Sequence, residues 1–294
     1  MPDSSSPNGL ESERAALSAS AGSAICRVPQ VPWRGASPSR LSHGAESVRL
    51  VPEETAVAFT YNRSAHAVMM ATPADLEDFA VGFTLNEGIV GSPRDIEEID
   101  VVRGKLGIEL RMWIGHANGI AFYERRRFLA GPTGCGLCGI ESLADAMRPV
   151  PPVTGDVRVS AMTIQRAIAG LPAAQRLYRE TRAVHGAAYW EPGAGLVALR
   201  EDVGRHNALD KLAGALARAG FSAKNGVVLL TSRISVEMVQ KAARMGAPIV
   251  AAVSAPTALA VRLADAAGIT LIGVARDDGF ETFTHPQRVT EDHV

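Results

Sequence analysis

Two cysteines in a glycine-rich stretch are the residues most suited to chemistry in this sequence. Residues 134–139 read Gly-Cys-Gly-Leu-Cys-Gly, which places Cys135 and Cys138 three positions apart. The thiolate is the nucleophilic form of cysteine, and a Cys-x-x-Cys pair often has a lowered pKa. The glycines leave the backbone free to move, which suits an exposed, reactive cysteine better than a packed one. The basic run 125–127 either favours a thiolate or persulfide anion here or is a solvated strand end.

Three kinds of chemistry fit such a pair. A zinc site would need four ligands, and because no second Cys-x-x-Cys exists, histidines such as His116, His185 or His206 would have to complete it. A dithiol redox motif of the thioredoxin type belongs to a compact βαβ setting, whereas this pair lies in a glycine-rich connector. A carrier cysteine that holds a transferable sulfur as a persulfide suits a mobile loop. The cysteines alone leave all three open.

Composition limits the class of protein. The chain has 294 residues, 47% of them hydrophobic, with 30 Lys and Arg against 31 Asp and Glu. This is globular composition with room for one large or two ordinary domains. A net charge of −1 gives no overall attraction to nucleic acid or to an anionic membrane, and no apolar run is long enough to span one. Three cysteines are too few for a disulfide framework, so we expect a reducing, cytoplasmic location.

The chain divides into five segments by composition and periodicity. Residues 1–45 are rich in serine and proline and predict a flexible tail. Residues 46–130 predict a strand-rich domain with one helix, and 131–158 a Gly/Pro-rich cysteine loop and connector. Residues 159–288 predict an α/β domain, and 289–294 a second tail.

The strand-rich segment alternates short apolar runs with one amphipathic helix. Thr72 is the predicted N-cap of that helix, and Leu76, Phe79 and Phe83 form its apolar face. The predicted strands are 48–51, 55–61, 96–103, 107–113 and 119–123.

The α/β segment alternates strands with helices, which implies right-handed crossovers and a parallel sheet. The predicted helices are 162–170, 207–219, 235–245 and 256–267. The predicted strands are the hairpin 185–191 and 196–201, followed by 227–231, 248–253 and 270–275.

A binding site for an anionic, nucleotide-like ligand is predicted where the helices begin. Helix N-termini near 206, 235 and 256 present free backbone N–H groups at the carboxyl ends of the strands, where α/β proteins bind ligands. The side chains expected to gather there are those of Arg205, His206, Ser232, Arg233 and Ser235. Guanidinium and hydroxyl groups match phosphates well. We expect Asp202 and Asp210 to be surface charges.

Longer motifs resemble one family. The segment from Gly131 to Leu143 is similar to the cysteine loop of the FdhD family, the sulfur carrier proteins required for formate dehydrogenase activity. The resemblance spans about residues 46–288. Further matching segments are 181–188, 201–211, 231–242, 253–257 and 284–286.

The resemblance implies a reaction and its partners. A cysteine desulfurase passes sulfur to the carrier, which delivers it to the bis-guanine-dinucleotide molybdenum cofactor before insertion into formate dehydrogenase. Cys135 corresponds to the persulfide intermediate, and Cys138 would assist or resolve it. The segment implied to contact the cofactor is Val274, Ala275, Arg276, Asp277, Asp278 and Gly279. Two acidic residues there depart from the Lys-Pro-Gly-Arg-like form of some members.

The α/β segment also resembles the cytidine-deaminase-like fold. Zinc deaminases carry a Pro-Cys-x-x-Cys signature, but Ser232 and Ser235 stand at the cysteine-like positions here. Neutral serine hydroxyls are not usual zinc ligands, so no zinc is expected. The alternatives to a sulfurtransferase are a non-enzymatic chaperone for the molybdenum cofactor and, less favoured, a dithiol oxidoreductase. A homodimer is expected only because homodimers are the commonest protein oligomers.

Overall fold

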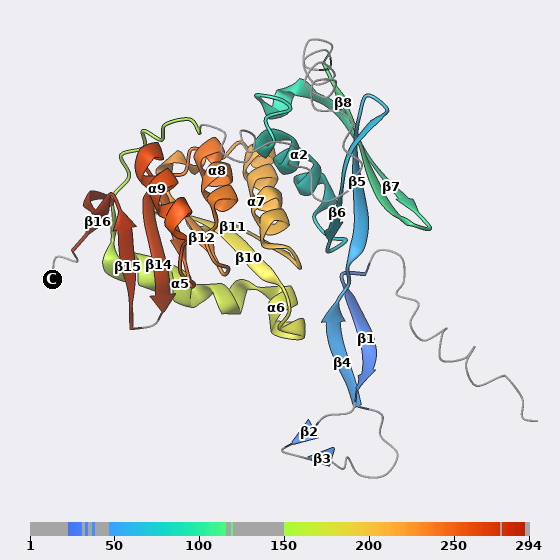
Figure 1. The fold of residues 1–294 in the computed structure, drawn as a ribbon, viewed down its shortest axis with the longest axis horizontal. Coiled ribbons are helices and arrows are strands. Elements are labelled where there is room, and N and C mark those ends of the chain that lie inside the picture. Colours follow the sequence, from blue (N-terminus) through green and yellow to red (C-terminus); the bar gives the residue numbers. More distant parts are fainter. Residues whose placement is uncertain are drawn as a thin grey trace, which may run out of the picture.

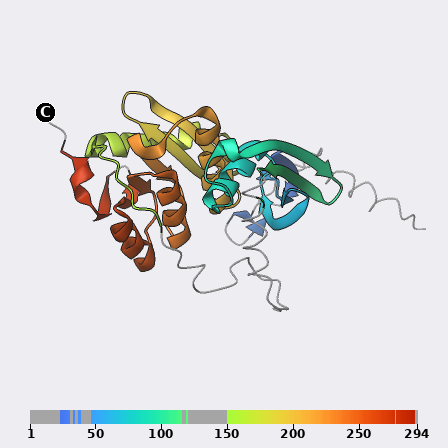
Figure 2. The same ribbon diagram turned by 90° about the horizontal axis from the view of Figure 1, so that it is seen from above.

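The structure, a computed structural model, describes residues 23–30, 33–34, 37–38, 47–115, 119, 150–276 and 278–291. The described residues form one sheet of four strands, one of six and three two-stranded sheets. Both views place the four-stranded sheet beside the six-stranded one, with helix α2 (Leu76–Asn86) next to helix α7 (Arg205–Ala219) (Figure 1, Figure 2).

The four-stranded sheet buries one face under α2. Its order is β6-β5-β8-β7, and its strands are β5 (Thr55–Tyr61), β6 (Ser64–Ala71), β7 (Ile96–Gly104) and β8 (Gly107–Ile114). Val57, Phe59 and Tyr61 alternate along β5 and are fully buried, as expected of a strand with one face on a core. The Phe59 ring stacks on Phe83 of α2, with ring centroids 4.1 Å apart.

A two-stranded ribbon extends from this sheet. Strand β1 (Ile25–Gln30) pairs antiparallel with β4 (Ser47–Pro52), and β2 (Trp33–Arg34) pairs with β3 (Ser37–Pro38). The sequence does not predict β1, which lies within residues 1–45. None of its residues is fully buried. A strand without a face on a core does not need alternating apolar residues, and its sequence shows no such alternation.

The six-stranded sheet is the core of the larger unit. Its order is β11-β10-β12-β13-β14-β15, with β12, β13 and β14 parallel and the outer pairs antiparallel. All four residues of β12 are buried, which explains its continuous apolar run. The strands are β10 (His185–Glu191), β11 (Gly195–Asp202), β12 (Val227–Leu230), β13 (Ile249–Ala252), β14 (Thr270–Arg276) and β15 (Gly279–Thr284).

Helices cover both faces of this sheet. Helices α7, α8 (Val236–Met245) and α9 (Ala258–Ala267) share one apolar cluster with it, and α5 (Ala161–Ala174) shares another. The remaining elements are short: α6 (Arg176–Thr181), β9 (Val159–Ser160), β16 (Val289–Thr290) and the 3-10 turns η1 (Pro93–Asp95), η2 (Ala223–Asn225) and η3 (Pro286–Arg288). None of the described helices is long and apolar enough to cross a membrane.

Two glycines let α2 and α7 pack closely. A Cβ added to Gly82 would lie 1.7 Å from the carbonyl oxygen of Asp210, and one on Gly214 would lie 1.8 Å from that of Asp78. Any larger residue would therefore push the two helices apart.

Buried ion pairs of the larger unit lie at the same junction. The prediction that Asp202 and Asp210 are surface charges is wrong, because their exposed fractions are 0% and 1%. The Asp202 carboxylate lies 2.6 Å from Lys211 Nζ, and Asp210 lies 2.8 Å from Lys241 Nζ. Each carboxylate has a lysine partner, which is what allows a charge to be buried.

Thr72 has a role other than the predicted one. Helix α2 begins later, and its cap residue is Asp75. Thr72 instead joins the two units: its N–H donates to Asp202, its hydroxyl accepts from the Val203 N–H and its carbonyl accepts from Lys211.

Most predicted strands and helices of the described part are confirmed within a few residues, and besides β1 the longest elements that were missed are β6, α6 and β15. Strand β6 has one β-branched residue, Val68, among alanines and methionines, so its strand signal is weak. Helix α6 follows a break at Gln175, and β15 is a partly exposed edge strand. The predicted strand at 119–123 and the connector up to residue 149 lie outside the described residues, apart from Gly119.

Candidate functional site

One edge of the six-stranded sheet collects the strand ends and helix starts that the sequence predicts for a site. Strands β12, β13 and β14 are parallel, so their carboxyl ends lie at this edge. The start of β10 and the end of β11 lie there too, because β10 runs antiparallel to both β11 and β12. Helices α7, α8 and α9 begin directly after these ends, so their free N–H groups also face this edge.

Two buried polar atoms at this edge lack a partner. Arg205 Nε and Ser235 Oγ are buried and have no hydrogen-bond partner among the described residues. Ser235 is the cap residue of α8, yet its side chain does not bond to that helix. Leaving such groups unpaired costs free energy, so each is available to a ligand with an acceptor oxygen.

The other two predicted residues on this loop differ in exposure. Ser232 is buried and its hydroxyl donates to the carbonyl of Arg233 at 3.0 Å. Arg233 is exposed. The structure therefore brings Arg205, His206, Ser232, Arg233 and Ser235 to one edge, with Arg233 on the outside.

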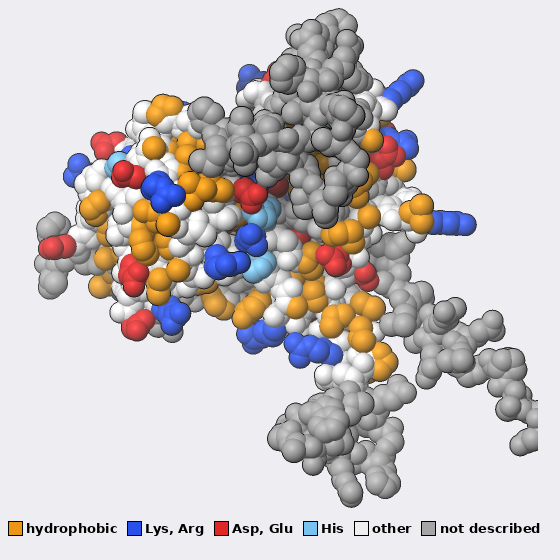
Figure 3. All heavy atoms as spheres, in the orientation of Figure 1, with side chains coloured by type: hydrophobic (Ala, Val, Ile, Leu, Met, Phe, Trp, Pro, Cys, Tyr) orange, Lys and Arg blue, Asp and Glu red, His pale blue; other side chains and the backbone are white. Residues whose placement is uncertain are grey.

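A histidine at this edge is held in its neutral form. Burial and the charges of Arg205 and Lys241 lower the pKa of His206 to about 4. Its Nε2 lies 3.1 Å from Oε2 of Glu237, so a neutral ring can donate there and present Nδ1 as an acceptor. Burial and Arg205 also lower the pKa of His185. Figure 3 shows histidine, Lys and Arg side chains gathered where the lower ends of α7 and α8 lie in Figure 1.

The depressed pKa of His206 predicts a pH dependence of stability. Below pH 6.5 the unfolded chain binds a proton that the folded chain does not bind until about pH 4, so this residue destabilises the fold progressively as the pH falls through that window. The His206→Gln variant should lose less stability between pH 6.5 and 4, by about 1–3 kcal/mol. Chemical unfolding at both pH values measures this difference, and identical losses for variant and wild type would contradict it.

The segment implied to contact the cofactor lies two strands away at the same edge. Val274 has φ 53°, a left-handed conformation that is strained for a β-branched residue, and its N–H bonds to the carbonyl of Ser254 at 3.3 Å. Ala275 is buried, Arg276 and Asp278 are exposed and Gly279 begins β15. Asp277 lies outside the described residues.

Cys135, Cys138 and the basic run 125–127 lie outside the described residues. Sequence reasoning also missed two residues near His206: Glu237, which lies 3.1 Å from its Nε2, and Lys241, whose charge helps to lower its pKa. Their spacing of four on α8 places both on one side of that helix, which was the only available signal.

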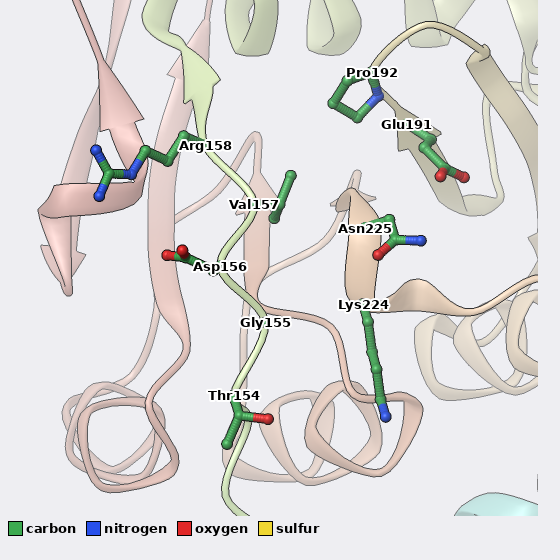
Figure 4. Close-up of a pocket in the computed structure, with 9 residues that line it drawn as sticks. All are labelled: Thr154, Gly155, Asp156, Val157, Arg158, Glu191, Pro192, Lys224 and Asn225. Carbon is green, nitrogen blue, oxygen red and sulfur yellow. The ribbon is translucent and has the colours of Figure 1, made fainter.

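The described residues hold no candidate metal site, and a cavity lies away from this edge. They hold no group of three or more His, Cys, Asp or Glu side chains that could bind a metal ion. A cavity of about 690 Å³ lies instead at the opposite edge of the sheet, between residues 154–158 and the ends of β10 and η2. Figure 4 shows Arg158, Lys224 and Glu191 pointing in different directions there, so its charges do not converge on one point.

Comparison with a solved structure defines the class of protein. The fold matches the crystal structure of a protein from Desulfotalea psychrophila described as a formate dehydrogenase accessory protein. The TM-score is 0.71 at 25% sequence identity, covering 91% of this chain and 100% of that one. The chain is thus a mixed α/β protein with the architecture of that accessory protein.

Sequence comparison defines the family. The family model described as the FdhD/NarQ family matches residues 52–290, and the chain belongs to this family. The sulfur carrier protein FdhD of Agrobacterium fabrum is 54% identical over 246 residues, covering 83% of this chain and 91% of that protein. The sulfur carrier protein FdhD of Cupriavidus necator is 51% identical over 239 residues, covering 81% and 83% respectively.

Proposed function

We propose that this protein is a cytoplasmic sulfur carrier that serves formate dehydrogenase. It accepts sulfur from a cysteine desulfurase as a persulfide on Cys135 and delivers it to the bis-guanine-dinucleotide molybdenum cofactor. The observation that carries the proposal is the family match over residues 52–290, which includes both cysteines of the pair. Relatives of about 50% identity that bear the name sulfur carrier protein support it.

The transfer balances with the cysteines of this chain. The Cys135 thiolate attacks the terminal sulfur of the desulfurase persulfide, and the desulfurase leaves as a thiolate. For delivery, the Cys138 thiolate attacks Sγ of Cys135 and forms a disulfide, releasing hydrosulfide to the metal. The two electrons that reduce the carried sulfur come from the thiol pair.

The sheet edge supplies a binding site for the cofactor, which is the acceptor substrate. The unpaired Arg205 Nε and Ser235 Oγ fit the oxygens of a phosphate, and the helix starts add backbone N–H groups. Neutral His206 offers an acceptor to a donor group on the ligand. Arg276, Asp278 and the strained Val274 extend this site along the edge.

The proposed cofactor site predicts nucleotide binding. Arg205→Gln should weaken the binding of GDP, which represents one half of the dinucleotide, about tenfold, because a charge-assisted hydrogen bond is lost. Titration calorimetry measures the affinity, and the substitution Arg262→Gln at an exposed position of α9 is the matched control. Equal affinities for Arg205→Gln and wild type would remove the residue from the site.

We also propose that the α/β unit is cytidine-deaminase-like without the zinc. Ser232 and Ser235 occupy the positions of the two metal-binding cysteines, and the same edge of the sheet would then bind the cofactor. A homodimer remains part of the proposal only because homodimers are the commonest protein oligomers.

Restoration of formate dehydrogenase in cells that lack their own carrier separates this function from its alternatives. The wild type should restore activity, and the Cys135→Ala/Cys138→Ala variant should not. Restoration by the double variant would favour a non-enzymatic cofactor chaperone. A dithiol oxidoreductase would instead require reversible oxidation of the pair coupled to a protein substrate.

A further inference from the structure

The short helix α6 carries a row of exposed arginines. Arg176 and Arg179 lie about one turn apart, and Arg182 follows the last helical residue as its cap. All three are exposed, and the Arg182 guanidinium lies over the ring of Tyr178 at 5.1 Å. Figure 3 shows blue side chains where α6 lies in Figure 1.

Among the described residues, these cations have no acidic partner. Arg49 of β4 adds a fourth guanidinium and donates to the carbonyl of Thr181 at 3.2 Å. Within the described part of the chain, none of the four arginines forms an ion pair, although Glu180 lies in the same helix. The net charge of the chain is −1, so its average composition does not account for four neighbouring arginines that lack an ion pair among the described residues.

Tertiary contacts hold the short helix α6 in place. Six residues are too few for a stable isolated helix, so tertiary contacts must fix it. The buried carboxylate of Glu201 accepts hydrogen bonds from the N–H groups of Leu177 and Tyr178, both at 2.8 Å, and Leu177 and Thr181 are buried. Three residues after Arg182 the chain enters β10 at His185, at the candidate site.

We propose that Arg49, Arg176, Arg179 and Arg182, here called the arginine surface, dock an acidic surface of the sulfur-donating protein. This inference rests on the proposed function. A carrier must bind and release its donor quickly, and exposed charges act mainly on the association rate. Because α6 is fixed in advance, docking does not have to order it.

The test compares two triple variants of equal charge. Arg176→Gln/Arg179→Gln/Arg182→Gln removes three charges from the arginine surface, and Arg94→Gln/Arg103→Gln/Arg262→Gln removes three exposed arginines elsewhere. Affinity for the cysteine desulfurase is measured by titration at low and high salt. We expect the first variant to bind about tenfold more weakly at low salt with a flatter salt dependence, and the second to bind like wild type.

Three results would overturn the inference. They are equal affinity of wild type and the first variant, absence of desulfurase binding to the wild type, and a loss of GDP binding by the first variant while desulfurase binding persists. A separate assay tests the proposed function: the protein is loaded with sulfur from inorganic polysulfide, a reaction that needs no docked partner. All variants should load equally from polysulfide, and failure of the wild type to load would count against the persulfide itself.

Discussion

Replacing Cys135 with alanine is expected to abolish sulfur transfer to the cofactor. The persulfide forms on this sulfur, and no other group in the proposed scheme can hold the transferred atom in its place. Activity of formate dehydrogenase matured with the variant should fall to the level seen without any carrier. The measurement is formate oxidation after maturation with desulfurase, cysteine and the variant protein.

Two further cysteine variants control this result. Cys26→Ala should retain full activity, because Cys26 lies in the ribbon strand β1 and its sulfur lies a long 3.7 Å from the backbone carbonyl of Arg27. Cys138→Ala should accept sulfur but release it slowly, because the resolving thiol is missing. Full activity of Cys135→Ala would contradict the assignment of the carrier sulfur.

Replacing Lys211 with methionine is expected to cause the largest loss of stability. Lys211 and Asp202 are both fully buried and lie 2.6 Å apart, and Lys211 also donates to the carbonyl of Thr72. The variant would leave the Asp202 carboxylate buried without a cation, which costs about 3–5 kcal/mol. The free energy of unfolding in denaturant measures this loss.

A matched control and a double variant make the result specific. Lys224→Met changes an exposed lysine and should stay within about 0.5 kcal/mol of wild type. Asp202→Asn/Lys211→Met should recover part of the loss, because no uncompensated charge remains. A loss of less than about 1 kcal/mol for Lys211→Met would show that removing the cation does not leave a costly buried charge.

The parallel core could be predicted because its signals are local. The apolar runs of β12 and β13 and the glycines that end α7, α8 and α9 mark each element, and Gly220, Gly246 and Gly268 all adopt the left-handed conformation expected of such ends. The strand-helix alternation then places Arg205 and Ser235 at one edge.

The junction between the two units could not be predicted in the same way. In the sequence, Asp202 and Asp210 resemble surface residues and Thr72 resembles a helix cap. In the structure their partners lie more than a hundred residues away in the chain or on a neighbouring helix. The neutral state of His206 likewise depends on burial and on Lys241 of α8. Such pairings are long-range and leave no local pattern.

The persulfide is tested most directly by peptide mass spectrometry. The protein is incubated with cysteine and a cysteine desulfurase, trapped with an alkylating agent and digested. We expect the peptide containing Cys135 to gain the mass of one sulfur atom, to lose it on treatment with a reductant and to show no gain in Cys135→Ala. An unmodified Cys135 peptide in fully active protein, or the added sulfur found only on Cys26, would contradict the account.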